Sequence, residues 1–399
     1  MRKETHDFLR GEIIPIIKDR GGDASSSQNY RGITLSSIFA QMFEIALRLK
    51  FGYFLRSSEL QFGFKPGMST SHAMFSLKNC INYFTSRGSN VFTAFLDLTK
   101  AFDTISHYGL FIKLMERQVP LCFLLIIMYW YMNMSVSCKW GGAKSESFEV
   151  TNGTKQGGVL SPDLFAIYLD ELLVRLKASG VGCRIAEMFL ACILFADDMT
   201  LAAPSRSALQ KLINVAVAYC EEYCLNFNAK KTKIIVFGPK YKEVGAFARV
   251  KIGDTDIDYV DSWRYLGFYL KIGIECCFCP ENELKSFFRA SNGILTTLSK
   301  PNEAVLMHIL YSNCVSILTY GSEVKEFTKR DFMTCNTSVN NAIRKIFSYK
   351  HYESIRTLRE QFGYLSLTEL FAKSKKRFHN SLSNSTNSVL CKLCEVVCQ

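Results

Sequence analysis

The sequence predicts an α+β protein in which an antiparallel sheet is followed by a helical C-terminal region. Three observations indicate this class. Helical and strand-like apolar patterns mix without the regular strand–helix–strand repeat that builds a parallel sheet. Ala191–Ala203 has the pattern of a strand, a tight turn and a second strand, which is typical of antiparallel pairing. From about Leu284 the apolar residues recur mostly at helical spacing, with one face formed by Val305, Ile309, Leu310, Cys314 and Leu318.

The N-terminal part is predicted to contain one strand and two helices. Isoleucines on both sides of Pro15 indicate a strand over Glu12–Lys18, and Gly, Asp and Ser residues make Asp19–Asn29 a loop. After a second loop over Gly63–Ser69, a helix is predicted over Ser71–Phe84, with Ser69 and Thr70 as candidate caps. Between the loops, Ser36–Phe54 is predicted to be a helix because apolar residues recur at helical spacing: Phe39, Met42, Phe43, Ala46, Leu47 and Phe51.

The central part is predicted to alternate strands and helices. Strands are expected over Val91–Leu98, Phe148–Thr151 and Lys233–Phe237, and helices over Ser106–Arg117, Ser161–Ala178 and Ser207–Tyr223. Pro162 falls in the first turn of the long helix, where proline is tolerated. Leu121–Met132 is an unbroken apolar run of 12 residues. A membrane-spanning helix needs roughly 20 residues, so a buried core helix is the preferred interpretation and a membrane segment is the alternative.

Composition and charge predict an intracellular protein that binds a polyanion. The 399 residues are 48% hydrophobic, which is typical of a globular chain. Lys and Arg number 48 against 36 Asp and Glu, and this net charge of +12 favours nucleic acid or an anionic membrane surface as partner. Met1–Arg10 is polar and charged, and the 15 cysteines form no short repeating framework. We therefore expect no secretion, and reduced cysteines in the nucleus or cytoplasm.

Three aspartates are the strongest candidates for a catalytic site. Asp197 and Asp198 are adjacent at the tip of the predicted hairpin, and Asp97 lies at the end of the buried strand Val91–Leu98. Neighbouring carboxylates in apolar surroundings are costly unless a cation offsets their charge. Magnesium ions prefer carboxylate oxygens, and acids that converge at strand ends are what a two-metal site requires. For Asp197 and Asp198 alone, a surface Asp-Asp turn is the alternative.

Seven segments resemble, in order, the motifs of reverse transcriptases of non-LTR (LINE-type, Jockey-like) retrotransposons. Phe95–Asp103 resembles the first catalytic motif, and Phe195–Asp198 resembles the central catalytic box. Gly153–Phe165 is similar to the motif that opens the substrate-binding helix. The two finger motifs and the later palm and primer-grip motifs are matched by Asn29–Leu35, Gln61–Gly67, Leu225–Thr232 and Tyr265–Gly267. Together the matches cover about Ile13 to Leu270.

The resemblance implies a right-hand polymerase fold. The reverse transcriptase domain is expected over about 12–270, with fingers over 12–85 and a palm with an antiparallel sheet over 86–270. A mostly helical thumb and C-terminal tail are expected over 271–399.

The implied activity is that of an RNA-directed DNA polymerase, which extends a primer 3′-hydroxyl with dNTPs by a two-metal mechanism. Its cofactors would be two Mg²⁺ ions, and its partners an RNA template, a DNA primer and dNTPs, with no membrane. Full elements of this type also encode an endonuclease before the polymerase, and that domain is expected to be missing here. The alternative is a catalytically inactive nucleic-acid-binding remnant or a maturase-like RNA-binding protein.

The resemblance also assigns roles to single residues. Asp97, Asp197 and Asp198 would hold the metal ions, and Lys231, or the adjacent Lys230, would protonate the leaving pyrophosphate. Tyr265, Leu266 and Gly267 would form the primer grip. The nucleotide would be bound by Arg31, Lys65, Phe102, Gln156 and Gly157, with Lys18 as a weaker candidate. At the position of Phe102 a bulky ring would clash with a ribose 2′-hydroxyl, although core packing is the alternative role of that ring.

Two positions depart from the family pattern, and one cluster lies outside it. Met68 stands where the second finger motif usually has a basic residue, and Phe195 stands where the central box more often has Tyr. At the C-terminus, Cys391, Cys394 and Cys398 form a candidate zinc site. Structural zinc sites need four ligands, and only three are present in this cluster.

Overall fold

The centre of the protein is a six-stranded sheet. The structure, a computed structural model, describes residues 8–297 and 302–397. The strand order is β12–β13–β11–β3–β10–β9, and every neighbouring pair is antiparallel except β11 with β13. The strands are β3 (Val91–Asp97), β9 (Cys192–Phe195), β10 (Asp198–Ala203), β11 (Lys233–Phe237), β12 (Val250–Ile252) and β13 (Thr255–Tyr259). The predicted antiparallel sheet and its hairpin at Ala191–Ala203 are therefore confirmed.

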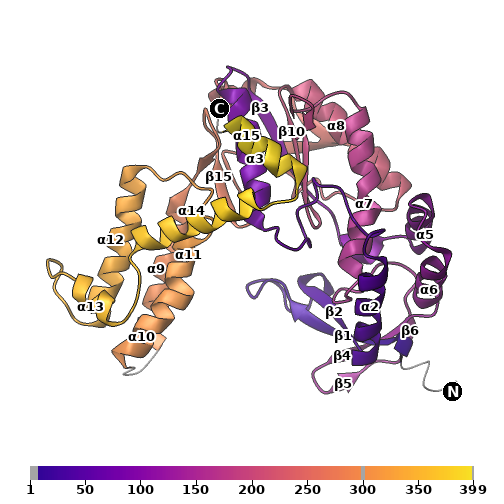
Figure 1. Ribbon diagram of the computed structural model, residues 1–399, viewed down its shortest axis with the longest axis horizontal. Helices are drawn as coiled ribbons and strands as arrows, with labels where there is room; N and C mark the ends of the chain where they lie inside the picture. The colour runs from indigo at the N-terminus through magenta and orange to yellow at the C-terminus, as the bar shows by residue number, and fades with distance from the viewer. Residues whose placement is uncertain (1–7, 298–301, 398–399) are drawn as a thin grey trace.

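Helices cover both faces of this sheet (Figure 1). α3 (Thr70–Thr85) lies on one face, whereas α8 (Arg206–Glu222) lies on the other, with α7 (Ser161–Ala178) beside it. The start of α8 is set locally, because the Ser205 hydroxyl accepts a hydrogen bond from the Ala208 N–H. Between the layers, large side chains such as Tyr168 and Tyr219 are completely buried. Their burial fixes α7 and α8 against each other and against the sheet.

A second sheet contains the first two strands of the chain and has the order β2–β1–β4–β5, with β6 paired to β4. Its strands are β1 (Arg10–Ile17), β2 (Tyr30–Ser36), β4 (Ser135–Trp140), β5 (Ala143–Lys144) and β6 (Phe148–Glu149). β4 pairs in parallel with β1, so a segment from within the predicted palm region joins the sheet of the N-terminal segment. The boundary between fingers and palm at about residue 85 stays a prediction. Residues 135–149 follow that boundary in the sequence, yet they belong to the same sheet as β1 and β2.

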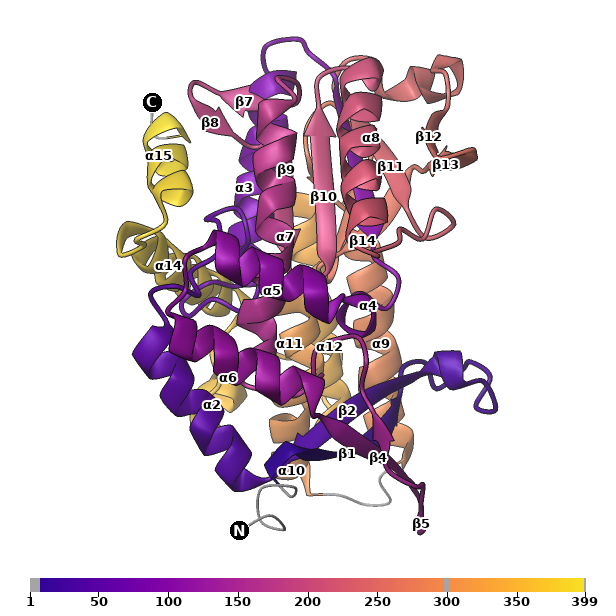
Figure 2. The same ribbon diagram turned by 90° about the vertical axis from the view of Figure 1, so that its right-hand side faces the viewer.

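Three helices, α2 (Ile38–Phe51), α5 (His107–Glu116) and α6 (Leu121–Met132), stack beside the second sheet (Figure 2). α6 has the predicted bounds, but the prediction that it is a buried core helix is only half right, since Leu121 is 68% exposed. In α2 the predicted inward face is also partly wrong, because Phe39 is 76% exposed while Glu44 is buried. α6 packs against α5 and also meets α2, where the rings of Phe51 and Phe123 lie 4.9 Å apart.

The membrane alternative for this apolar run finds no support. Among the helices of residues 8–297 and 302–397, none combines the length and the apolar character needed to cross a bilayer.

The C-terminal region is helical, as predicted. Its members are α9 (Pro280–Thr297), α10 (Glu303–Ile309), a π-helix (Leu310–Val315), α11 (Ser316–Thr319), α12 (Lys329–Ile346), α13 (Arg356–Gln361) and α14 (Leu367–Ser383). They enclose a separate apolar core around Phe287, Met307 and Ile343. The last helix, α15 (Ser388–Val397), returns to pack on α3 (Figure 1). These helices are joined to the central sheet through the small sheet of β14 (Ser262–Tyr265), β15 (Phe268–Lys271) and β16 (Cys277–Phe278).

The cysteines of the described residues form no disulfide. Cys391 and Cys394 lie on α15, whereas Cys398 lies outside the described residues. Within residues 8–297 and 302–397, no three His, Cys, Asp or Glu side chains are grouped closely enough to hold a metal ion. The zinc interpretation therefore stays a prediction that depends on Cys398.

Residues 60–63 dock directly on the β9–β10 hairpin. The Phe62 N–H donates to the Leu194 carbonyl at 2.8 Å, and the Leu194 N–H donates to the Leu60 carbonyl at 2.9 Å. At Gly63 the two chains approach so closely that an added Cβ would overlap the main-chain nitrogen of Ala196. Glycine at this position is therefore required by contact, because even a methyl group has no room.

We predict that Gly63→Ala lowers the free energy of unfolding by about 1–3 kcal/mol, because the added methyl forces the docked segment away from the hairpin. Gly293→Ala is the matched control, since Gly293 lies in α9 and an added Cβ there meets nothing within 4 Å. The control is expected to stabilise the protein by about 0.5–1 kcal/mol, as alanine does in helices. Urea unfolding measures both changes, and equal effects of the two substitutions would contradict the docking argument.

Candidate active site

The three candidate aspartates meet at one end of the central sheet. Asp97 is the last residue of β3, and it lies opposite Asp198, the first residue of β10, in the strand register. Between β9 and β10 the chain turns at Ala196, whose φ of +58° is in the left-handed region. The antiparallel pairing of β3 and β10 therefore brings Asp197 and Asp198 next to Asp97.

Gln61 holds this turn from the side. Its side chain is fully buried, its Oε1 accepts a hydrogen bond from the Ala196 N–H at 3.0 Å, and its Nε2 donates to the Ala196 carbonyl at 3.3 Å. A residue other than glycine in the left-handed region costs on the order of 1 kcal/mol or more, so it persists only where surrounding contacts hold it. The Gln61 amide supplies such contacts to both polar groups of Ala196.

Two of the carboxyl groups, those of Asp97 and Asp198, have raised pKa values. Removal from water, and then the negative charges of Asp197 and Asp97, raise the pKa of Asp198 to about 6, against the opposing effect of Arg31. Removal from water likewise raises the pKa of Asp97, although the Lys231 ammonium, 3.9 Å from Asp97 Oδ2, acts in the opposite direction. Negative charge thus accumulates at this end of the sheet, and a bound cation would relieve the repulsion.

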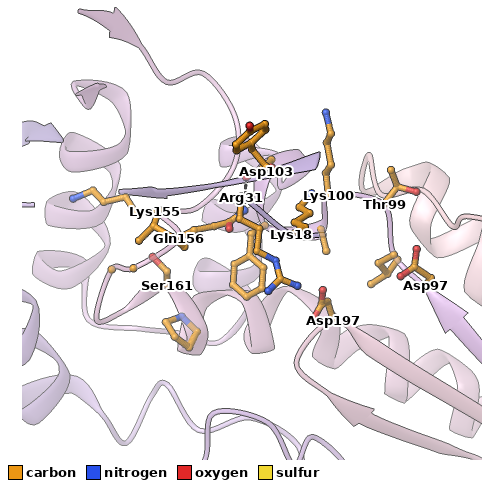
Figure 3. A pocket seen from close by; sticks show the side chains of 18 of the residues that line it. Lys18, Arg31, Asp97, Thr99, Lys100, Asp103, Lys155, Gln156, Ser161 and Asp197 are labelled. Carbon is orange, nitrogen blue, oxygen red and sulfur yellow. Dashed lines mark hydrogen bonds between the residues drawn. The ribbon is translucent and has the colours of Figure 1, made fainter. Parts of the chain in front are cut away.

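A cavity of about 650 Å³ opens beside the aspartates (Figure 3). Its walls come from β2 and the chain between β1 and β2, from the segment after β3, from the turn before α7 and from the loop after α8. The predicted site residues that line it are Lys18, Arg31, Asp97, Phe102, Gln156, Gly157, Asp197 and Lys231. The structure therefore collects residues from five separate sequence motifs around one space.

Positive side chains lie near the aspartates. Arg31 projects from β2 toward Asp197 (Figure 3), and the Lys231 ammonium lies 3.9 Å from Asp97 Oδ2. Lys18, at the end of β1, lines the same cavity and donates a hydrogen bond to the Gln28 carbonyl at 3.2 Å. Of the two adjacent lysines considered for the proton donor, Lys231 lines the cavity and Lys230 does not.

Phe102 forms part of the cavity wall from the short helix α4 (Ala101–Thr104). Its ring stacks on Phe165 of α7, with 4.4 Å between ring centroids and 18° between planes. The ring of Phe64 meets it edge to face at 6.0 Å. Because two other rings hold Phe102, its position in the wall is fixed before any ligand enters.

The turn before α7 carries Gln156 and Gly157 into the cavity. Gln156 Nε2 donates to Asp103 Oδ1 at 2.8 Å, and the Gln156 carbonyl accepts from the Thr34 N–H at 2.7 Å. Gly157 has a φ of +112°, and an added Cβ would lie 2.9 Å from the Thr34 carbonyl oxygen. This turn therefore needs glycine both for its conformation and for its close approach to β2.

Three predicted parts of the site lie outside the cavity. Lys65 does not line it, because its ammonium donates to the main-chain carbonyls of Ser57 and Ser58, and burial lowers its pKa. Tyr265–Gly267 forms the tight turn between β14 and β15, and the Tyr265 ring is buried against Phe95 instead of facing a ligand. Asp198, although it neighbours Asp97, is also absent from the cavity wall.

The sequence did not identify three residues that organise the site. Gln61 and Asp103 lie inside the matched sequence motifs. The motifs did not predict that Gln61 contacts Ala196 or that Asp103 contacts Gln156. Glu44 gave no signal, because it lies among apolar residues in a helix and its partners are far away in sequence.

Comparison with known proteins gives one family and a consistent set of relatives. Residues 17–270 match the family model described as reverse transcriptase (RNA-dependent DNA polymerase). The polyprotein of the type-2 retrotransposable element R2DM of Drosophila melanogaster is 28% identical over 253 residues, which are 61% of this chain and 24% of that protein. The RNA-directed DNA polymerase from mobile element jockey of Drosophila funebris is 25% identical over 271 residues, 65% of this chain and 28% of that one. The chain thus spans about a quarter of the length of these relatives.

A solved structure supports the fold. Apo telomerase from Candida tropicalis aligns with a TM-score of 0.52 at 11% identity, over 97% of this chain and 69% of that one. This agreement, together with the sheet and helices described above, confirms the predicted right-hand polymerase fold with a helical C-terminal region. The relatives confirm the resemblance to non-LTR retrotransposon polyproteins. Because the family model covers well over half of its 399 residues, the chain belongs to the reverse transcriptase (RNA-dependent DNA polymerase) family.

Proposed function

We propose that this chain is an RNA-directed DNA polymerase that extends a primer 3′-hydroxyl with dNTPs along an RNA template. The observation that carries the proposal is the shared cavity, in which Asp97 and Asp197 face Arg31 and Lys231 beside the fixed ring of Phe102. Acids at the ends of paired strands, opposed by phosphate-binding cations, are the arrangement that phosphoryl transfer needs. An intracellular location, in the nucleus or cytoplasm, is part of the same proposal.

Members of this family generally use divalent metal ions. We propose two Mg²⁺ ions held by Asp97, Asp197 and Asp198, a donor set of hard carboxylate oxygens suited to that ion. Bound magnesium would supply Lewis-acid stabilisation of the attacked phosphate and the leaving pyrophosphate. The raised pKa values of Asp97 and Asp198 support the fit, because burial and then the charge of the neighbouring Asp197 disfavour their ionised forms, and a bound cation would offset both effects. No three ligating side chains in the described part of the chain converge closely, so binding would require these side chains to turn.

The remaining cavity residues suit the substrate side of the reaction. The 3′-hydroxyl oxygen attacks the α-phosphorus, the bond to the β-phosphate bridging oxygen breaks, and pyrophosphate leaves. The Arg31 guanidinium and the Lys18 ammonium would bind the triphosphate, because their donors match phosphate oxygens. Lys231 would donate a proton to the leaving pyrophosphate. Gln156 and Gly157 would contact the nucleotide from the turn before α7.

The Tyr265–Gly267 turn would act as the primer grip through its main chain, since the Tyr265 ring is turned into the core. The Leu266 carbonyl is held by the Tyr320 hydroxyl at 2.8 Å, which gives this turn a fixed position relative to the C-terminal helices.

We predict that Asp197→Ala lowers the rate of primer extension by at least about a thousandfold, because a ligand of the proposed metal ions is lost. The measurement is extension of a DNA primer on an RNA template by the purified chain, with and without magnesium. Asp254→Ala is the control, since Asp254 is an exposed acid between β12 and β13, outside the cavity.

The same experiment decides between the proposal and its alternative. If the wild-type chain binds template and primer but adds no nucleotide, the polymerase proposal fails, and a binding protein without catalysis becomes the better account. If Asp197→Ala extends as fast as the control, the proposed metal ligands are wrong.

We also predict that Phe102→Val raises the ratio of kcat/KM for rNTPs to that for dNTPs by about tenfold or more. The reason is that a smaller side chain leaves room for the ribose 2′-hydroxyl in the cavity wall. The measurement is single-nucleotide incorporation with matched dNTP and rNTP. Phe111→Val, at a buried ring of α5 outside the cavity, is expected to leave the ratio unchanged. An unchanged ratio in Phe102→Val would restrict the role of that ring to core packing.

A further inference from the structure

A buried carboxylate on α2 contacts the start of α7. Glu44 is 5% exposed, and its Oε2 accepts hydrogen bonds from the main-chain N–H groups of Val159 and Leu160, the latter at 3.1 Å. These groups immediately precede α7, which begins at Ser161. Main-chain N–H groups at the start of a helix have no partner within the helix, and the helix dipole favours negative charge there. Glu44 therefore accepts hydrogen bonds from main-chain N–H groups at the start of α7 that have no acceptor within α7.

The counter-charge of Glu44 comes from the nucleotide turn itself. Lys155 Nζ lies 3.5 Å from Glu44 Oε1, and Lys155 is 5% exposed. Its ammonium also lies 4.5 Å from the centroid of the Trp130 ring. Lys155 points away from the aspartates and from its neighbour Gln156 (Figure 3). Burial lowers the pKa of Lys155, and the charge of Glu44 acts in the opposite direction by favouring the charged lysine.

These contacts bracket the turn that enters the cavity. Lys155, Val159 and Leu160 are held by Glu44, while Gln156 between them is held by Thr34 and Asp103 on the cavity side. Glu44 thus contacts both ends of the turn from another helix, in addition to the hydrogen bonds from the Thr154 N–H to the Phe102 carbonyl at 2.7 Å and from the Gly158 N–H to the Lys155 carbonyl at 3.1 Å. A turn without the Glu44 contacts would be less constrained, and a nucleotide would have to order it further on binding.

We propose that Glu44 is a positioning residue for nucleotide binding, which fixes the main chain of residues 155–160 so that Gln156 and Gly157 face the incoming nucleotide. Glu44 does not line the cavity itself, so its effect passes entirely through the turn. The inference rests on the proposed polymerase function for its kinetic test, and on structure alone for a second test.

The kinetic test is single-nucleotide incorporation by Glu44→Gln, compared with the wild-type chain. Glutamine keeps one acceptor oxygen but leaves the Lys155 charge buried without a partner. We expect the KM for dNTP to rise about tenfold, while kcat and the affinity for primer–template change by less than about threefold. In the double variant Glu44→Gln with Lys155→Met the unpaired charge is gone, so the KM is expected to return to within about threefold of the wild-type value.

Lys113→Met is the matched control for buried charge. Lys113 is as buried as Lys155, and it pairs with Glu171 between α5 and α7, away from the cavity. It is expected to lower stability without changing the KM for dNTP. A wild-type KM in Glu44→Gln, or an equal rise of KM in Lys113→Met, would overturn the proposal.

The second test needs no catalysis. Amide hydrogen exchange of the full chain without nucleotide reports on Val159 and Leu160, whose N–H groups bond to Glu44. We expect Glu44→Ala to speed exchange at these two amides at least about tenfold, and Lys113→Met to leave them unchanged. If the wild-type chain incorporates no nucleotide, the proposed function fails, but exchange still decides the role of Glu44. Unchanged exchange in Glu44→Ala would refute the role even in an active polymerase.

Discussion

The site depends on the docking of residues 60–63 on the β9–β10 hairpin. Gln61 bonds both polar groups of Ala196, and Gly63 lets the two chains touch. This contact stabilises a left-handed residue at the tip of a hairpin that carries two like charges, and neither feature is favourable by itself. It also fixes the N-terminal segments relative to the central sheet. This joint helps to hold the Arg31 side of the cavity opposite Asp197, together with the hydrogen bond from the Thr34 N–H to the Gln156 carbonyl.

Charge in the cavity is arranged so that repulsion and attraction act at different places. The acids gather at the sheet end, where Asp97 and Asp198 have raised pKa values. The cations lie on β2 and on the loop after α8, and the Lys231 ammonium is 3.9 Å from Asp97 Oδ2. A tight ion pair would neutralise the carboxylates and leave little attraction for another cation. Because the carboxylates and the cations are not tightly paired, both can still attract a ligand. This suits a ligand that carries phosphates together with metal ions.

Sequence patterns predicted those features that depend on neighbours in the chain. The β9–β10 hairpin, the buried strand ending at Asp97 and the glycine turn at Gly157 follow from local periodicity and conformation. Features that depend on distant partners were missed or misplaced. Glu44 points into the protein, where it accepts hydrogen bonds from residues 115 and 116 positions away in the sequence. The buried face of α2 therefore differs from the predicted one. Lys65 has the charge expected of a phosphate ligand, yet two nearby carbonyls capture it.

The C-terminal helices show the same limit and add a mechanical argument. A π-helix at Leu310–Val315 lengthens one turn, so Val305 of the predicted apolar face is exposed while Leu310 and Leu318 are buried. Just beyond it, the Tyr320 hydroxyl bonds the Leu266 carbonyl and the Thr70 hydroxyl, both at 2.8 Å. One side chain thus ties the C-terminal region to the β14–β15 turn and to α3 together. A Cβ added at Gly267 would lie 2.8 Å from the Tyr320 ring, so the turn is packed closely against the C-terminal region as well as hydrogen-bonded to it. The turn proposed to hold the primer is therefore anchored to the C-terminal region, whereas the Glu44 contacts anchor the nucleotide turn to α2.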